Sequence, residues 1–481
     1  MKKLMSLGIA MSLLWSCGEA PQKETTSEEV TEEKVSSFTP VSNEAMESAV
    51  IYEANIRQYS PEGTFEEFTK DIPQLKDLGV KVIWLMPIYP ISMKNRKATD
   101  DLSIEDIEDE KKREKYLGSY YAISDYTAVN PEFGNMEDFE NLVETAHENG
   151  MYVILDWVAN HTGWDHAWLE EHPEYYIKNK DGEITDPINT ETGETWGWTD
   201  VAHLDYDNQE LREAMKNEMK FWVEEMNVDG FRCDVAGEVP TDFWEPTVAE
   251  LQSIKPLFML AESEKKDLFH EAFDMGYNWE GHHIKNELAQ GKMKVSDWDD
   301  YMAKIDTTYQ KDDYLMNFLT NHDENSWNGT IDERMGDAKW AMLGLVYTLP
   351  GMPLIYSGQE YDMDHRLKFF EKDEIPKEKG KMWPMLEKLG KLKKTNKALH
   401  GAKESADYER LTTSDDEYVL AFKREKDGDV VVFIANFTDE ERSFSLDFEG
   451  EFTDFETGEE DFVHPEEEMT YPAWGYQILV K

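Results

Sequence analysis

Short runs rich in apolar residues, each followed by an acidic residue, recur along the chain. Four of these runs are 152–155, 228–233, 257–261 and 315–320, and they lead to Asp156, Asp234, Glu262 and Asp323. An apolar run of four to six residues is typical of a buried strand, and a charge directly after it lies where the strand leaves the core. Helix-like stretches separate the runs, so the pattern predicts an α/β fold, a (β/α)8 barrel with functional side chains on its C-terminal rim.

Other periodic stretches fit the same barrel. Residues 50–56 alternate and predict a first strand, and apolar residues at three- and four-residue spacing from Phe65 to Leu75 predict an amphipathic helix that ends at Gly79. Residues 80–86 predict a second strand. The remaining expected elements are a charged helical excursion at 100–115, helices at 139–146, 211–226 and 341–349, and a last strand at 353–356.

Two regions depart from the barrel pattern. Residues 162–203 are rich in Trp, Gly, Asp and Pro, and their length predicts a small inserted subdomain after the third strand rather than a plain loop. After residue 398 short alternating segments are separated by turns, which predicts a C-terminal antiparallel β-sandwich. We therefore expect the barrel at 46–398 and the sandwich at 399–481.

The charge of the chain excludes some partners. The 481 residues include 49 basic and 102 acidic side chains, for a formal net charge of −53, and the acids are spread along the chain. Nucleic acids and anionic membrane surfaces are bound by positive stripes, so neither is an expected partner. Such acidity favours solubility.

The N-terminus has the features of an export signal. Lys2 and Lys3 precede an apolar stretch at 4–15 that is too short to span a bilayer, and Cys17 follows it. Residues 14–17 resemble a bacterial lipobox, which implies that residues 1–17 are a signal ending at a lipidated Cys17; ordinary signal cleavage nearby is the alternative. Residues 18–45 are mostly polar and predict a flexible tether. We expect an exported lipoprotein at the outer membrane or cell surface, with the periplasmic face as the alternative.

The acids fit one kind of chemistry. Cleavage of a glycosidic bond needs a carboxylic acid to protonate the leaving oxygen and a second carboxylate to meet the developing positive charge. Asp234 and Glu262 are 28 positions apart, room for one strand-to-strand crossover, and are expected side by side on the rim, with Asp323 on the far wall. Arg232 lies on the same face of its strand as Asp234 and can keep that carboxylate ionised. One such acid alone is more often a helix cap or an arginine partner.

The four segments, in this order, resemble the conserved regions of the α-amylase family of glycoside hydrolases over about residues 50–360. The stretches 121–134 and 351–360 resemble further segments of that family. The resemblance implies a retaining mechanism with Asp234 as nucleophile, Glu262 as acid/base and Asp323 as transition-state stabiliser. It also implies substrate contacts, namely Tyr121 stacked beneath the sugar and Asp156, His161, Arg232 and His322 around it.

Two positions depart from the family pattern. Many members carry Lys-His shortly after the nucleophile, whereas Asp234 is followed here by Val235-Ala236-Gly237-Glu238, so the contacts to the leaving group must differ. Many calcium-binding members have an aspartate where this chain has His203. Asn160 keeps one calcium ligand of the family, but a hard cation prefers a set of oxygens. We therefore expect that no cofactor is required and that the structural calcium is doubtful.

The leading hypothesis is an enzyme that hydrolyses α-1,4-glucosidic bonds in starch- or glycogen-like α-glucans or maltooligosaccharides. Trp164, Trp168, Trp196 and Trp198 are candidates to stack on sugars or to pack the inserted subdomain. A glucanotransferase or an oligosaccharide-trimming α-glucosidase is the alternative, since both use the same three acids. A non-catalytic glucan-binding protein is opposed by the presence of all three acids. Expected partners are the glucan, the membrane through the lipid only, and candidate glucan-import proteins at the cell surface.

Overall fold

The computed structural model describes residues 38–99, 102–189, 192–465 and 467–481. The predicted signal, Cys17 and the tether as far as residue 37 lie outside these ranges. Within the described ranges every helix is too short or too polar to cross a lipid bilayer.

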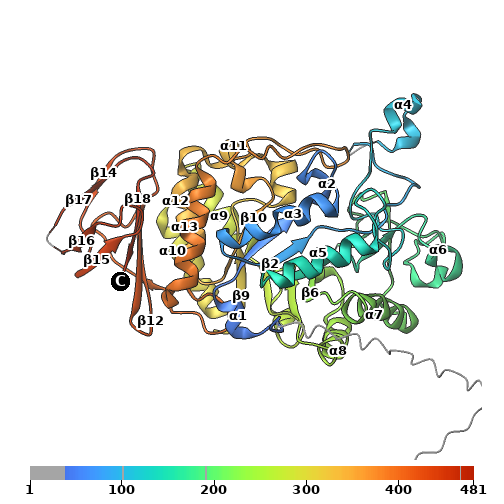
Figure 1. Ribbon diagram of the computed structural model, residues 1–481, viewed down its shortest axis with the longest axis horizontal. Helices are drawn as coiled ribbons and strands as arrows, with labels where there is room; N and C mark the ends of the chain where they lie inside the picture. Colours follow the sequence, from blue (N-terminus) through green and yellow to red (C-terminus); the bar gives the residue numbers. More distant parts are fainter. Residues whose placement is uncertain (1–37, 100–101, 190–191, 466) are drawn as a thin grey trace, which may run out of the picture. The chain divides into compact units, whose positions relative to one another are not determined.

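Eight parallel strands close into a barrel in the order β1-β10-β9-β8-β7-β6-β3-β2. Figure 1 labels β2, β6, β9 and β10 of this barrel, among the helices that surround it. Their bounds are Val50–Ala54 (β1), Val80–Leu85 (β2), Tyr152–Trp157 (β3), Gly230–Cys233 (β6), Phe258–Ala261 (β7), Met275–Tyr277 (β8), Tyr314–Asn317 (β9) and Met352–Tyr356 (β10). Nearly every residue of these strands is buried, because helices cover the outer face and side chains fill the interior. The predicted barrel is confirmed.

Helices connect the strands and cover the barrel. The longer ones are α3 (Phe65–Leu75), α5 (Met136–Glu148), α7 (Gln209–Glu224), α8 (Thr241–Gln252), α9 (Trp279–Ala289), α10 (Val295–Thr308), α12 (Lys339–Thr348) and α13 (Met382–Thr395). Short helices are α1 (Asn43–Glu47), α2 (Ile56–Tyr59), α4 (Glu110–Arg113), α6 (Trp168–Glu171) and α11 (Ile331–Met335). The apolar stripe of α3 is buried as its spacing predicts, and Gly79 follows with a φ of 81°, a left-handed conformation that suits glycine.

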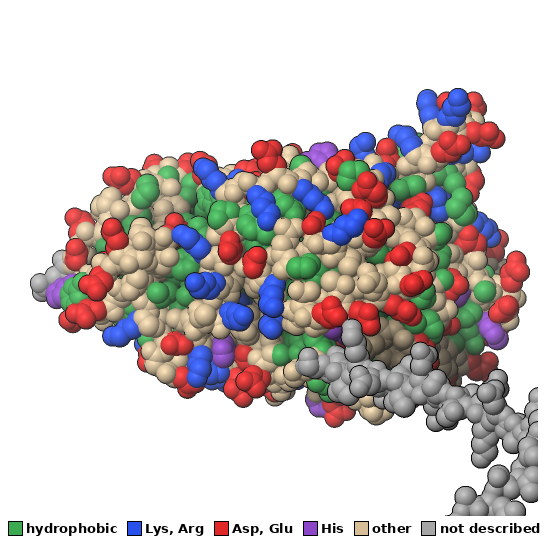
Figure 2. Space-filling model, viewed as in Figure 1, with side chains coloured by type: hydrophobic (Ala, Val, Ile, Leu, Met, Phe, Trp, Pro, Cys, Tyr) green, Lys and Arg blue, Asp and Glu red, His purple; other side chains and the backbone are tan. Residues whose placement is uncertain are grey.

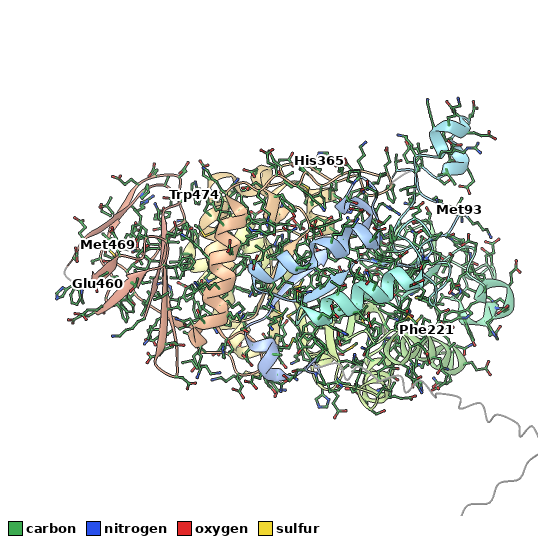
Figure 3. All side chains as sticks on the ribbon, in the orientation of Figure 1. Met93, Phe221, His365, Glu460, Met469 and Trp474 are labelled. Carbon is green, nitrogen blue, oxygen red and sulfur yellow. The ribbon has the colours of Figure 1, made fainter. Side chains whose placement is uncertain are left out.

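Two long connections leave the regular pattern. The one between β2 and α5 includes α4 and carries Met93, which is 60% exposed (Figure 3). The one between β3 and α7 contains α6 and a two-stranded antiparallel sheet of β4 (His161–Gly163) and β5 (Val201–His203). This second connection occupies the range in which the sequence predicts an inserted subdomain.

The C-terminal part consists of two antiparallel sheets. A six-stranded sheet has the order β11-β12-β13-β18-β15-β16, and β14 pairs with β17. The bounds are Glu409–Arg410 (β11), Val419–Lys426 (β12), Asp429–Asn436 (β13), Arg442–Phe444 (β14), Gly450–Asp454 (β15), Glu460–Val463 (β16), Met469–Tyr471 (β17) and Tyr476–Val480 (β18). Alternate residues of β12 and β13 face opposite ways, so Phe422 and Phe433 join the barrel core while Ala421 and Val432 pack in a separate core with Phe444.

The described chain begins on the barrel. The ring of Phe38 stacks on His147 at 4.1 Å, and its edge meets Tyr152 at 5.1 Å. Glu47 in α1 accepts hydrogen bonds from the backbone N–H groups of Ala402 and Glu404. The last part of the range predicted as a tether, residues 38–45, is therefore packed on the barrel, because its few apolar side chains find partners there.

Acidic side chains are spread over the face of the molecule that Figure 2 shows. In the view of Figure 2 they are scattered among basic and apolar groups and do not gather in one patch. This distribution agrees with the even spread of acids along the sequence.

Candidate active site

The three acids lie at the C-terminal ends of barrel strands. Asp234 directly follows β6 and Glu262 directly follows β7, and these strands are neighbours in which Cys233 pairs with Ala261. Asp323 comes from the segment after β9, three places from β6 around the barrel. Asp234 and Glu262 are therefore adjacent, as their spacing predicts.

The acids face a cavity of about 380 Å³ that opens at this rim. Its lining residues are Lys97, Ser119, Tyr121, His161, Trp198, Asp200, Val201, Asp234, Val235, Glu262, His322, Asp323, Trp327, Phe369 and Phe370. Aromatic rings and carboxyl groups are prominent in this lining. Such a lining suits a polyhydroxylated ligand whose ring faces are apolar and whose edges form hydrogen bonds.

Arg232 contacts three carboxyl groups, those of Asp156, Asp234 and Glu262, below the cavity. Its Nη1 donates to Oδ1 of Asp156 at 2.8 Å and to Oδ1 of Asp234 at 3.0 Å. Its Nη2 lies 2.9 Å from Oε1 of Glu262, an ion pair. The guanidinium is fully buried, and the ring of Trp84 packs against it with 4.9 Å from Cζ to the ring centroid. Arginine can serve three carboxyl groups because its planar fork has donors on several sides.

The backbone after Asp234 is bent to reach Glu262. Val235 has a φ of 36° and a ψ of 44°, a left-handed conformation that is unusual for a β-branched residue. Its N–H donates to Oε2 of Glu262 at 2.8 Å. Strain of this kind persists only where the surroundings impose it, and here it fixes one oxygen of the acid next to Asp234.

The surroundings shift the pKa of both neighbouring acids upwards. Burial raises the pKa of Glu262 to about 7, against the opposing effect of Arg232. Burial also raises the pKa of Asp234 to about 6, again opposed by Arg232. A raised pKa keeps a carboxyl group available as a proton donor, and one ionised and one protonated carboxyl group are the states that a nucleophile and a general acid need.

Glu53, His322, Tyr121 and Asp156 form a chain of hydrogen bonds beside the three acids. Nε2 of His322 lies 2.7 Å from the hydroxyl of Tyr121, and that hydroxyl donates to Oδ2 of Asp156 at 3.2 Å. Nδ1 of His322 lies 2.5 Å from Oε1 of Glu53. The chain fixes the ring of Tyr121, which is half-buried and lines the cavity, in one orientation.

His161 and Trp198, both in the connection between β3 and α7, also line the cavity. Asn160 donates from Nδ2 to Nδ1 of His161 at 3.3 Å, so the proton of this neutral ring is on Nε2. Burial lowers the pKa of His161 to about 3. Trp198 meets His161 edge-on at 5.8 Å and stacks on Trp196 at 5.6 Å, and Trp196 is 43% exposed. His161 is thus a neutral hydrogen-bonding group beside an aromatic pair.

Two residues that the sequence predicts to contact the substrate, Asp156 and Arg232, lie behind the cavity lining. Asp156 and Arg232 are fully buried and do not line the cavity, because the oxygens of Asp156 already accept from Arg232, Trp84 and Tyr121. They support the residues that face the cavity. Trp168 is buried in the core, and Trp164 is partly buried and donates to the backbone of Thr199.

The sequence did not identify several lining residues. Trp327, Phe369 and Phe370 form an aromatic cluster beside Asp323, with 5.2 Å between the rings of Trp327 and Phe369. The ring of Phe369 is nearly parallel to Tyr121 at 6.3 Å. Phe369 and Phe370 lie beyond the last barrel strand in a segment without regular spacing, so no sequence pattern marked them.

The residues around Asn160 do not fit a calcium ion. The Asn160 side chain bonds to the imidazole of His161, and His203 pairs with His161 across β4 and β5. Nδ1 of His203 accepts from the N–H of Ile188 at 3.3 Å, and burial lowers the pKa of His203 to about 4. The side chains described next to Asn160 therefore include the neutral imidazoles of His161 and His203, whereas a hard cation prefers oxygen ligands.

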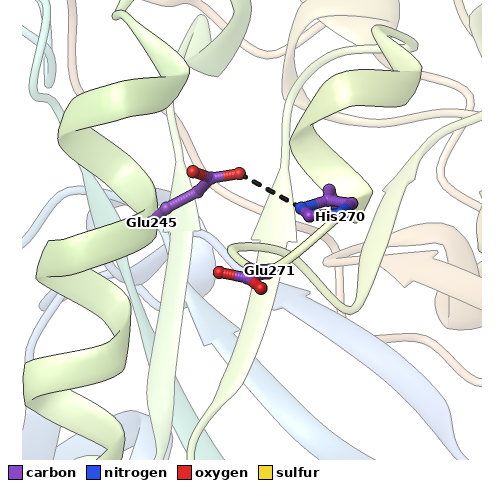
Figure 4. Close-up of side chains that lie close together, drawn as sticks. All are labelled: Glu245, His270 and Glu271. Carbon is purple, nitrogen blue, oxygen red and sulfur yellow. Dashed lines mark ion pairs between the residues drawn. The ribbon is translucent and has the colours of Figure 1, made fainter.

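Another group of potential ligands lies outside the cavity. Glu245 of α8 pairs with His270 at 3.4 Å, and Glu271 lies beside them (Figure 4). His270 and Glu271 are exposed, and none of the three lines the cavity. Exposed clusters of this kind are common on acidic proteins and do not identify a metal site.

We expect calcium to have little effect on stability. In a chelator the thermal midpoint should fall by less than about 10 °C, because an ion stabilises a fold only where the folded state binds it, and the side chain of Asn160 contacts the imidazole of His161, which is not an oxygen ligand. Differential scanning calorimetry with and without chelator measures this. A larger fall that calcium alone reverses would contradict the assignment.

Comparison with known proteins points to one family. Residues 35–417 match a family model described as alpha amylase, catalytic domain. Alpha-amylase 3 of Dictyoglomus thermophilum is 28% identical over 66% of this chain, and the match spans 64% of that relative's length, which is less than two thirds. A 4-alpha-glucanotransferase of Thermotoga neapolitana is 27% identical over 63% of this chain and 68% of its own length.

A solved structure extends the likeness over most of the chain. The crystal structure of a noncanonic maltogenic alpha-amylase, AmyB, from Thermotoga neapolitana superposes with a TM-score of 0.79 and 28% identity. The match covers 91% of this chain and 99% of that one.

Proposed function

The chain belongs to the α-amylase family, and from this premise we propose that it is a retaining glycoside hydrolase that cleaves α-1,4-glucosidic bonds in starch- or glycogen-like glucans. The observation that carries the proposal is the pair formed by Asp234 and Glu262. Both acids face one cavity, both contact Arg232, and burial raises the pKa of each.

The proposed reaction has two displacements. In the first, Asp234 attacks the anomeric carbon while Glu262 protonates the leaving oxygen, so the glycosidic bond breaks and a glycosyl ester forms. In the second, Glu262 removes a proton from water, whose oxygen attacks the same carbon and releases Asp234. Asp323, which is 37% exposed at its side chain and lies 3.4 Å from His322, is available to sugar hydroxyls in both steps.

Aromatic groups support a chain-like substrate. Trp198, on which Trp196 stacks, lines the cavity from one connection, and Trp327 and Phe369 line it beside Asp323. Each pair offers ring faces on which a glucose unit can stack. Together they favour a glucan over a single sugar as the ligand.

Transfer to another sugar is the alternative outcome of the second displacement. A glucanotransferase or an oligosaccharide-trimming α-glucosidase would use the same acids, and the relative from Thermotoga neapolitana is a 4-alpha-glucanotransferase. Chromatography of the products from soluble starch, glycogen, pullulan and maltotriose over time separates these activities. Hydrolysis gives reducing ends in proportion to bonds cleaved, whereas transfer from maltotriose gives longer chains without a net gain in reducing ends.

We propose that lipid on Cys17 holds the enzyme at the outer membrane or cell surface. The lipobox-like residues 14–17 and the polar segment after them support this location. Candidate partners there are glucan-import proteins, which would take up the released oligosaccharides.

Cys17→Ser is expected to abolish lipidation and to leave the activity of the soluble domain unchanged. Acyl chains contribute about 0.8 kcal/mol for each buried methylene group, so their loss should release the protein from membranes. Labelling with radioactive fatty acid and fractionation measure both effects. A variant that still takes up label and sediments with membranes would show that the anchor lies elsewhere.

A further inference from the structure

Glu53 is a buried carboxyl group that the proposed reaction does not use. It lies in β1, is fully buried and does not line the cavity. Its Oε1 lies 2.5 Å from Nδ1 of His322, while its Oε2 has no hydrogen-bond partner among the described residues. A buried charge persists when it is paired. His322 is the group with which Glu53 pairs.

The other nitrogen of His322 faces the cavity. Nε2 lies 2.7 Å from the Tyr121 hydroxyl and 3.4 Å from Oδ2 of Asp323. The ring stacks on Tyr121 at 5.5 Å and meets the edge of Trp84 at 6.0 Å. Contacts on both nitrogens and on the ring faces hold this imidazole in one orientation.

Charges from several elements act on His322. Glu53 faces it from β1, Asp323 from its own segment, Asp156 from β3 and Arg232 from β6. Burial lowers the pKa of His322, but Asp323 and Glu53 outweigh this effect against the opposition of Arg232, and the pKa rises to about 9. At neutral pH the ring is therefore an imidazolium in which both nitrogens donate.

We propose that Glu53 is a positioning residue: by pairing with Nδ1 of His322 it holds this ring as an imidazolium whose Nε2–H donates to the Tyr121 hydroxyl, beside Asp323 and a bound sugar hydroxyl. The last contact rests on the proposed function. The protonation state also sets the direction of the neighbouring hydrogen bond. In a neutral ring with its proton on Nδ1, Nε2 would accept from Tyr121, and the Tyr121 hydroxyl would no longer donate to Asp156.

Glu53→Gln tests the charge while keeping the shape of the side chain. We expect kcat/KM for soluble starch to fall about tenfold or more at about pH 8, and to stay within about threefold of wild type at about pH 5.5. The difference arises because the imidazole, which loses Glu53 but keeps Asp323 beside it, is protonated to a larger extent at the lower pH. An equal loss at both pH values would indicate a structural role only and would overturn the proposal, as would no loss at either.

Glu360→Gln is the matched control. Glu360 is also fully buried, shortly after β10, the strand next to β1, and it accepts from the Tyr52 hydroxyl at 2.5 Å and from the Gly358 N–H at 2.8 Å. Its described hydrogen bonds do not include His322. Burial raises the pKa of Glu360 to about 7, so the control is read on His322, whose pKa its substitution should leave unchanged.

Nuclear magnetic resonance of the wild-type protein supplies a test that needs neither substrate nor a stable variant. With ¹⁵N-labelled histidine, His322 should remain an imidazolium at about pH 7.5, and Glu53→Gln should lower its pKa by at least about one unit. A neutral His322 at about pH 7 in the wild-type protein would overturn the proposal even if the variant did not fold. Because this measurement needs no glucan, failure of the proposed substrate and failure of this inference are distinguishable.

Discussion

Glu262→Gln is expected to lower kcat for soluble starch by about 10²- to 10⁴-fold while leaving glucan affinity within about threefold of wild type. The amide keeps the size of the side chain but has no proton to give to the leaving oxygen. Its position, on the cavity wall beside Asp234 and held by the Val235 N–H, is the reason to assign this role.

A substrate that needs no proton sharpens this test. Fluoride leaves without protonation, so α-maltosyl fluoride should still glycosylate Asp234 in the Glu262→Gln variant, and azide should then accelerate release as the α-glycosyl azide. The matched control is Glu264→Gln, two residues further on, where the side chain accepts from the Glu280 N–H and does not line the cavity. Starch turnover near the wild-type rate in Glu262→Gln would refute the assignment.

Asp234→Asn is expected to cause a loss at least as large as that of Glu262→Gln. The amide is a poor nucleophile, so no glycosyl ester forms, and its loss of charge also removes the ion pair with Arg232, which lies 3.0 Å away. Mass spectrometry after incubation with maltosyl fluoride should find a sugar on the peptide of Asp234 in Glu262→Gln and none in Asp234→Asn. A sugar attached to another side chain would contradict the nucleophile assignment.

The chemistry of Asp234→Gly provides an independent check on the same role. The smaller side chain leaves room for azide on the face opposite the leaving group, and one displacement by azide gives the β-glycosyl azide. The Glu262 variant should give the α form because two displacements occur. Opposite anomers from the two variants would separate the two roles in a way that loss of activity alone does not.

The sequence predicted the parts of the site that local patterns encode. Asp234 and Glu262 each follow an apolar run, and their separation placed them on neighbouring strands, as the pairing of β6 with β7 shows. The helix from Phe65 to Leu75 was visible in its spacing and in Gly79. These features depend on neighbours along the chain, and for that reason a single sequence reveals them.

Contacts between distant residues were not predictable in this way. Glu53 and His322 are separated by 269 positions, and nothing in the pattern of β1 distinguishes Glu53 from an ordinary strand residue. β8 has only three residues, too few to show a period, yet its Tyr277 bonds to Nε of Arg232 at 3.2 Å. The conformation of Val235 is imposed by its surroundings, and valine by itself disfavours it.

The configuration of the first product tests the central claim most directly. The wild-type enzyme should be mixed with a maltooligosaccharide, and proton NMR should follow the new reducing end before mutarotation equilibrates it. Two displacements through Asp234 predict that the α anomer appears first. Early accumulation of the β anomer would show a single displacement and would contradict a retaining mechanism with Asp234 as nucleophile and Glu262 as acid/base.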